Sequence, residues 1–126
     1  MKKITNFIIN NLSWVKGFGY TQKAGNGDEI VFESQDVKIT INYFTTGSDK
    51  SLLIGIRKLN ENKSYFFHEY LDFKGLKKIV PLPSESDEEF INRFLIELKR
   101  HAEGDLKTVF SGDEWIAVPR DYSPYK

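Results

Sequence analysis

The sequence predicts an α+β fold, an antiparallel β-meander of four to six strands packed on one face by an N-terminal helix and a C-terminal helix. Three observations predict it. Apolar and polar residues alternate over residues 37–43, which is typical of a strand with one buried face. Short polar turns on both sides of this segment favour antiparallel neighbours, because parallel strands need long crossover connections. Apolar residues also recur at helical spacing near both ends of the chain, so two amphipathic helices can cover the sheet.

The first helix is predicted over residues 3–16. Five apolar residues fall on one side of it, namely Ile4, Phe7, Ile8, Leu12 and Val15. Gly17 stands where the end of a helix favours a left-handed residue. Trp14 lies near this end, and we expect its large ring to fill the edge of the core.

Five strands are predicted over residues 18–23, 29–33, 37–43, 52–56 and 64–67. Asn26 and Gly27 indicate a hairpin turn between the first two, because both residues tolerate the positive φ angles of tight turns. The residues expected on the inward face are apolar and alternate along the strands: Ile30, Phe32, Val37, Ile39, Ile41, Tyr43, Leu52, Ile54 and Ile56.

A short helix over residues 69–74, ended by Gly75, is predicted to follow the sheet. The connection 76–84 contains Pro81 and Pro83 and is therefore not expected to form regular structure. We expect a last short helix over residues 105–111 and an edge strand over residues 116–118.

The main C-terminal helix is predicted over residues 87–103. Ser86 and Glu89 have the spacing of a capping box, which satisfies free backbone N–H groups at a helix start. The buried side of the helix is expected to consist of Phe90, Ile91, Phe94, Leu95, Leu98 and Ala102. Acidic residues gather at the same helix start (Glu85, Asp87, Glu88 and Glu89), where the helix dipole favours negative charge.

The chain has 126 residues, which suits a single domain over residues 1–118 with a C-terminal tail over 119–126. Its 18 Lys and Arg residues balance 18 Asp and Glu residues, whereas a dedicated nucleic-acid binder usually has a basic excess. We therefore expect no nucleic-acid partner. The only basic cluster consists of Lys74, Lys77 and Lys78.

Composition also limits the cellular setting that we expect. The absence of cysteine excludes disulfides and thiolate nucleophiles and fits a reducing compartment. Asn and Thr residues interrupt the apolar start of the chain, so it does not read as a signal peptide, and no segment has the length of a membrane span. The chain is rich in Lys, Asn and Ile, which favours a bacterial origin. Together with the observations on cysteine, signal peptide and membrane span, this leads us to expect a cytoplasmic protein without a membrane partner.

A search for chemistry predicts no catalytic residue, no metal and no cofactor. His68 is followed one turn later by Asp72, but the second histidine of a zinc-protease motif is missing. The other histidine, His101, falls in the last turn of the main helix, where it complements the helix dipole. Gly17, Gly19, Gly25 and Gly27 lack the strand–loop–helix context of a dinucleotide fingerprint.

The order of segments resembles that of small bacterial α+β proteins, either uncharacterised or immunity proteins of polymorphic toxin systems. The resemblance lies in an N-terminal helix, the segments 16–20, 30–34 and 37–43, a capped late helix, and the sequence Ser-Gly-Asp-Glu-Trp at 111–115. It implies a cytoplasmic, non-enzymatic protein that binds and neutralises one toxin domain. Because such proteins vary greatly, the resemblance implies no particular binding residue.

The leading hypothesis is therefore a protein-binding module. Its expected contact residues are Trp115 with Asp113 and Glu114, together with Tyr122 and Tyr125, and Tyr20 is expected as a further surface aromatic.

Two alternatives remain open. One is a small-ligand-binding or enzymatic domain with a pocket between sheet and helices, using His68, Glu69, Tyr70 and Arg57. The other is a structural homodimer that pairs through an exposed sheet edge.

Overall fold

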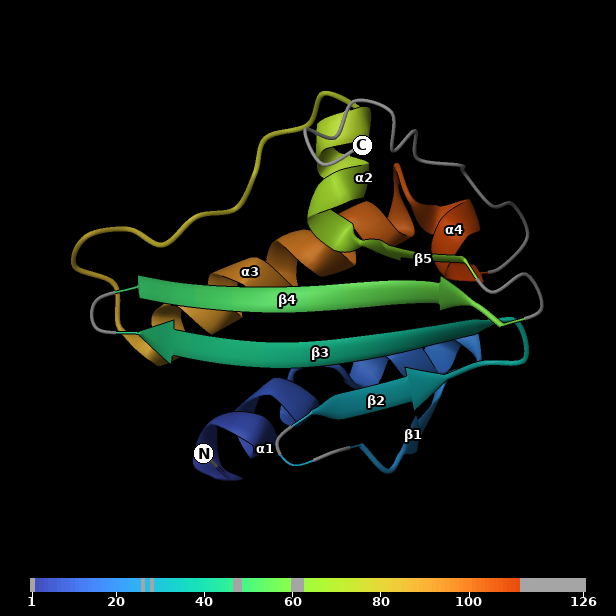
Figure 1. The fold of residues 1–126 in the computed structure, drawn as a ribbon, viewed down its shortest axis with the longest axis horizontal. Helices are drawn as coiled ribbons and strands as arrows, with labels where there is room; N and C mark the ends of the chain where they lie inside the picture. Colours follow the sequence, from blue (N-terminus) through green and yellow to red (C-terminus); the bar gives the residue numbers. More distant parts are fainter. Residues whose placement is uncertain (1, 26, 28, 47–48, 60–62, 112–126) are drawn as a thin grey trace.

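The computed structural model describes residues 2–25, 27, 29–46, 49–59 and 63–111. These residues form one sheet with helices on one of its faces (Figure 1). The elements, in chain order, are α1 (Lys2–Asn10), the 3₁₀ helix η1 (Ser13–Phe18), β1 (Thr21–Lys23), β2 (Ile30–Glu33), β3 (Val37–Thr46), β4 (Asp49–Lys58), β5 (Lys63–Phe66), α2 (Phe67–Phe73), α3 (Asp87–Glu103) and α4 (Lys107–Ser111).

The sheet is a meander in the order β1-β2-β3-β4-β5, and every neighbouring pair is antiparallel. The register places Ile39 opposite Ile56 and Ile41 opposite Ile54, so inward residues from β3 and β4 lie side by side. The predicted α+β class and the predicted meander are confirmed. The prediction succeeds because alternating apolar residues in β3 and β4 determine which face of the sheet is buried.

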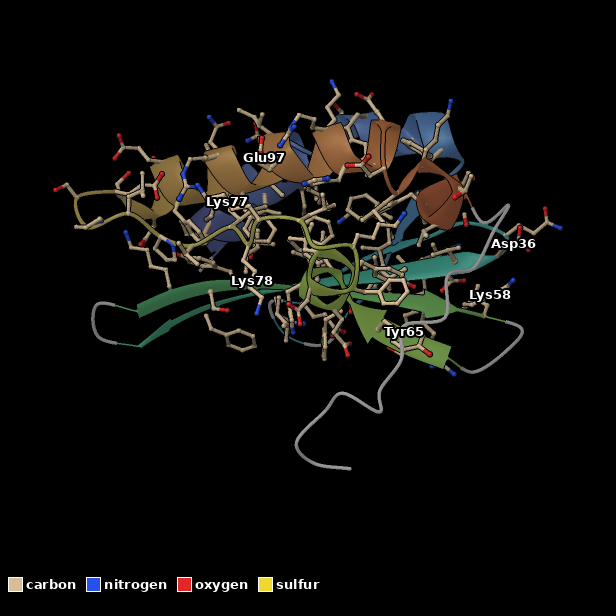
Figure 2. The ribbon with its side chains drawn as sticks, turned by 90° about the horizontal axis from the view of Figure 1, so that it is seen from above. Asp36, Lys58, Tyr65, Lys77, Lys78 and Glu97 are labelled. Atoms are coloured by element: carbon tan, nitrogen blue, oxygen red, sulfur yellow. The ribbon has the colours of Figure 1, made fainter. Side chains whose placement is uncertain are left out.

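Helices α1 and α3 cover one face of this sheet (Figure 2). The inward strand residues pack there against the apolar side of α3, on which Ile91 and Ala102 have no exposed surface. The predicted buried residues of α3 are all buried. Among the described residues, no helix has both the length and the apolar character that a membrane span requires.

The start of the main helix forms as predicted. The Ser86 hydroxyl accepts a hydrogen bond from the Glu89 N–H (3.2 Å), and the Glu89 carboxylate accepts one from the Ser86 N–H (2.8 Å). This reciprocal pair satisfies two donors that have no partner within the helix.

The N-terminal prediction is wrong in one part. Helix α1 ends at Asn10, whereas the sequence predicts that it continues to residue 16. The 3₁₀ helix η1 follows, and β1 begins at Thr21 instead of residue 18. The left-handed residue is Gly19 (φ 87°), not Gly17. The Asn11 side chain donates a hydrogen bond to the Phe7 carbonyl (2.8 Å), a local bond that competes with further helix. Trp14 is partly buried against the core, as predicted.

The prediction that Tyr20 is a surface aromatic is wrong, because the residue is buried. Its side chain is 2% exposed, and its hydroxyl donates a hydrogen bond to the Phe110 carbonyl (2.5 Å) in α4. The residue lies directly after Gly19 and before β1, where the chain enters the sheet. Its ring therefore joins the N-terminal part of the core to the C-terminal one.

The remaining element predictions agree with the structure to within three residues; β3 ends three residues later and β4 begins three residues earlier than predicted. Gly75 ends the segment after α2 in the left-handed region (φ 68°), as expected. The predicted edge strand at 116–118 and the tail at 119–126 lie outside the described residues, as do Asn26 and Asp28 of the first turn.

Candidate functional site

The candidate site is an open strand edge. Strand β5 pairs with β4 only from Gly55 to Lys58. Among the residues that the structure describes, no strand therefore lies beside residues 49–54 on the side of β4 that faces away from β3. Figure 1 shows this part of β4 facing the long connection between α2 and α3 instead of a strand. Unpaired strand edges are the places where an additional strand can join a sheet.

The hydrogen-bonding direction along β4 identifies the free backbone groups. The Leu59 N–H donates to the Asp36 carbonyl (3.0 Å), so alternate residues from Arg57 back to Ser51 direct their backbone groups towards β3. The residues between them, including Lys50 and Leu52, direct theirs away from β3. Because β5 does not reach Lys50 or Leu52, their backbone groups point off the sheet.

A mostly apolar groove of about 280 Å³ lies along this edge. We call it the edge groove. It is bounded by β4 residues 50–54, by the connection residues 78–81, by Phe67, His68 and Leu71 of α2, and by Phe90 and Phe94 of α3. Val80 is 57% exposed at its rim. The edge groove therefore combines an apolar surface with free backbone groups.

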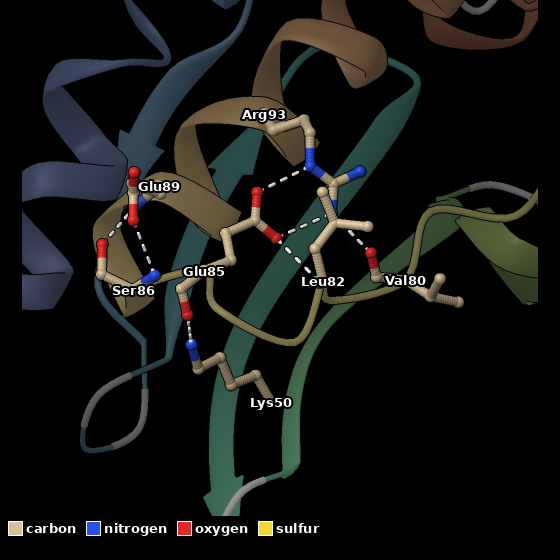
Figure 3. A network of polar contacts seen from close by, with 7 residues as sticks. All are labelled: Lys50, Val80, Leu82, Glu85, Ser86, Glu89 and Arg93. Carbon is tan, nitrogen blue, oxygen red and sulfur yellow. Dashed lines mark hydrogen bonds and ion pairs between the residues drawn. The ribbon is translucent and has the colours of Figure 1, made fainter.

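A polar network holds the outer wall of the edge groove in place (Figure 3). Arg93 of α3 binds both carboxylate oxygens of Glu85, at 2.7 and 2.8 Å, and also donates to the Val80 carbonyl (2.5 Å). The same carboxylate accepts a hydrogen bond from the Leu82 N–H (3.0 Å). These contacts fold the connection back onto α3 and so place residues 78–81 opposite β4.

Lys50 ties this wall to the strand. Its ammonium group donates a hydrogen bond to the Glu85 carbonyl and lies 3.6 Å from the Asp87 carboxylate. The hydrogen bonds from Arg93, with that from the Leu82 N–H, lower the pKa of Glu85 to about 2, so its carboxylate is charged at neutral pH. The acidic group at the start of α3 thus holds the connection in place as well as complementing the helix dipole.

A second, more open groove lies on the other side of the connection, between residues 76–79 and α3. Its volume is about 530 Å³. Two of its cations are already engaged, since Arg93 binds Glu85 and Arg100 binds Glu97 (2.5 Å). This groove is therefore a mixed-charge surface and not a concentrated anion site.

The chain matches no family model, no curated protein and no solved structure.

The described residues contain no group of three or more His, Asp or Glu side chains placed to hold a metal ion. His68 is exposed, and its ring stacks on Phe66 with centroids 5.5 Å apart. His101 is buried and lies 3.6 Å from the Asp105 carboxylate. The two histidines lie at different places in the fold and do not form a common site.

The contact residues predicted from sequence, Trp115, Asp113, Glu114, Tyr122 and Tyr125, all lie outside the described residues. Their role stays a prediction.

The four polar residues of the alternative pocket are not brought together. Only His68 borders the edge groove. The Glu69 carboxylate accepts a hydrogen bond from the Phe66 N–H (2.8 Å) at the start of α2, and Tyr70 is fully buried. Arg57 follows the inward residue Ile56 and therefore lies on the opposite face of the sheet.

The sequence does not indicate the edge groove, because the groove depends on how much shorter β5 is than β4. The predicted fifth strand was itself short, and ten residues of β4 cannot all be covered by four residues of β5. The two predicted strands, over residues 52–56 and 64–67, differ in length by only one residue, so their comparison does not indicate the open edge.

Proposed function

We propose that this protein is a non-enzymatic binding module whose partner is another protein, and that this partner is a toxin domain that it neutralises. One observation carries the first part: an open strand edge lies beside an exposed apolar groove. Apolar grooves and free strand edges are common recognition surfaces for polypeptides. The second part rests on the resemblance in segment order to immunity proteins.

The geometry favours a polypeptide over a small molecule. The edge groove, at about 280 Å³, lies just under the usual size of ligand pockets. Its polar groups are the backbone of β4 and side chains at the rim, not several side chains that converge on one point. An elongated partner can use both the backbone groups and the apolar wall.

Co-expression in the native host tests the toxin hypothesis. The gene directly upstream is expressed alone and together with the full chain, and growth and complex formation are measured. We expect the upstream product to arrest growth and the full chain to restore it while forming a complex with that product. A harmless upstream product, or growth arrest that the full chain does not relieve, would contradict the hypothesis.

Light scattering separates this proposal from the homodimer alternative. A binding module that awaits its partner is expected to be monomeric at micromolar concentration. A stable dimer that dissociates when the edge groove is altered would instead assign the edge to self-association.

A further inference from the structure

We infer that the edge groove takes an extended, acidic peptide segment, which adds as a strand to β4 and places an apolar side chain in the groove. This inference rests on the proposed function and names the chemistry of the partner. Strand addition fits the site because the backbone groups of Lys50 and Leu52 point off the sheet edge. In this mode the main chain supplies hydrogen bonds, and pockets for alternate side chains supply selectivity.

The apolar part of the site lies where an added strand would direct every second side chain. Leu52 and Ile54 turn their side chains towards the core, and the groove continues this inward face beyond the edge of β4. Phe67, Leu71 and Phe90 form its floor. A medium-sized aliphatic side chain on the added strand would therefore be buried against them.

The charges around the edge groove select an acidic partner. The titratable side chains that border it are Lys50, His68 and Lys78, and none of its bordering residues is a carboxylate. Lys50 is paired with Asp87, whereas Lys78 makes no ion pair with any residue that the structure describes. Figure 2 shows Lys78 on the side of the connection nearer the sheet and Lys77 on the side nearer α3. An acidic residue of the peptide is expected to pair with Lys78.

The same charges argue against a second copy of this chain as the occupant. Antiparallel pairing of two β4 edges about Leu52 would bring two grooves together, each with its own Lys78 at the rim. Like charges placed across an interface oppose association. A different partner, with carboxylates, complements the edge groove better.

Selection from a displayed library of random peptides tests this inference on the full chain. We expect selected peptides to carry at least one Asp or Glu next to alternating apolar residues. Their affinity should fall with rising salt, because the contact to Lys78 is exposed to solvent. Selection of only neutral or basic peptides, or of none, would overturn the inference, while growth rescue by the full chain would still support the proposed function.

Two matched pairs of variants locate the binding. Val80→Ser should weaken the best peptide by about fivefold or more, whereas Leu82→Ser should change its affinity by less than about twofold. Both side chains are exposed to similar extents, at 57% and 53%, but only Val80 borders the edge groove. Lys78→Glu should weaken binding and its neighbour Lys77→Glu should not, because only Lys78 borders the edge groove. Equal effects within either pair would overturn the inference.

Amide exchange measured by NMR gives a direct readout of strand addition. The Leu52 N–H, which points off the sheet, should exchange quickly in the free protein and slowly with the peptide bound. The Leu53 N–H, which faces β3, should be protected in both states. A peptide that binds without slowing exchange at Leu52 would overturn strand addition and leave the proposed function standing.

Discussion

At the scale of single residues, polar groups hold distant segments together. Tyr20 and Phe110 are ninety positions apart, yet one hydrogen bond joins them inside the core. Glu85 and Arg93 fix the connection between α2 and α3 in a similar way. Neither contact has a recognisable sequence pattern. The bond of Tyr20 spans most of the described chain, and Glu85 and Arg93 are eight residues apart, across the start of α3.

Replacing Tyr20 by Phe should destabilise the protein by about 1–3 kcal/mol, because the Phe110 carbonyl would lose its buried partner. Urea unfolding at neutral pH measures this change. Burial also raises the pKa of Tyr20 above its usual value of 10.0. The stabilisation from the protonated hydroxyl is therefore complete below pH 10 and decreases as the pH rises beyond it. The Y20F variant should lack this alkaline component, and an unchanged alkaline profile would contradict the assignment.

Replacing Glu85 by Gln should lower the melting temperature at neutral pH, because Arg93 would lose its charged partner. The pKa of Glu85 falls from an ordinary 4.5 to about 2 in the folded protein. Its contribution is therefore present above pH 4.5 and disappears as the pH falls towards 2. The difference in melting temperature between the two proteins should shrink over the same range.

Glu88 offers the matched control for that measurement. It is an exposed residue in the first turn of α3, and it makes no ion pair with any described residue. Glu88→Gln should leave the melting temperature nearly unchanged at every pH. If both variants behaved alike, the network around Glu85 would not hold the connection.

At the scale of elements, α3 shows how strictly one helix separates its two sides. Ile91 has no exposed surface, whereas Ile96 is 57% exposed. Ile91→Ala should lower the free energy of unfolding by about 2–5 kcal/mol, through lost burial and the remaining cavity. Ile96→Ala removes the same atoms and should change it by less than about 0.5 kcal/mol. Chemical denaturation of the two variants makes the comparison, and similar losses would mean that the orientation of α3 is wrong.

Elements with strong local patterns could be predicted from the sequence. The period-two alternation in β3 and β4 and the capping box of α3 are local features, and the structure agrees with each of them. The segment after α1 could not be predicted, because helical spacing continues to Val15 while the backbone tightens into η1. The choice there depends on packing: Trp14 and Phe18 contact each other edge to face, with centroids 6.0 Å apart.

The candidate site was less predictable than the fold. It is built from one strand edge, the end of a short neighbour and a proline-containing connection, and its geometry depends on where β5 stops. In the sequence, Lys77 and Lys78 stand out only as part of a basic cluster. Both lysines border the second groove, but only Lys78 also borders the edge groove. This difference follows from the path of the connection, which the network around Glu85 determines.

At the scale of the whole molecule, the centre of the sheet is held more tightly than its edges. Strand β3 lies between β2 and β4, so its backbone groups are bonded on both sides over residues 38–41. Strand β1 has three residues, all exposed, and a single neighbour. The open part of β4 belongs to these edges, which is where a protein can accept a partner without disturbing its core.

Native-state hydrogen exchange should resolve this difference. Amides of β3 at residues 38–41 are expected to exchange only through global unfolding, because both neighbouring strands must separate first. Amides of β1 should exchange faster, through local opening. The Ile91→Ala variant makes the comparison sharper. In β3 it should raise the amide exchange rate by the factor that corresponds to its loss in the free energy of unfolding. In β1 it should leave the amide exchange rate unchanged. Equal acceleration in both strands would show that the edges of the sheet open only together with the core, and the open edge of β4 would then not be an independent binding surface.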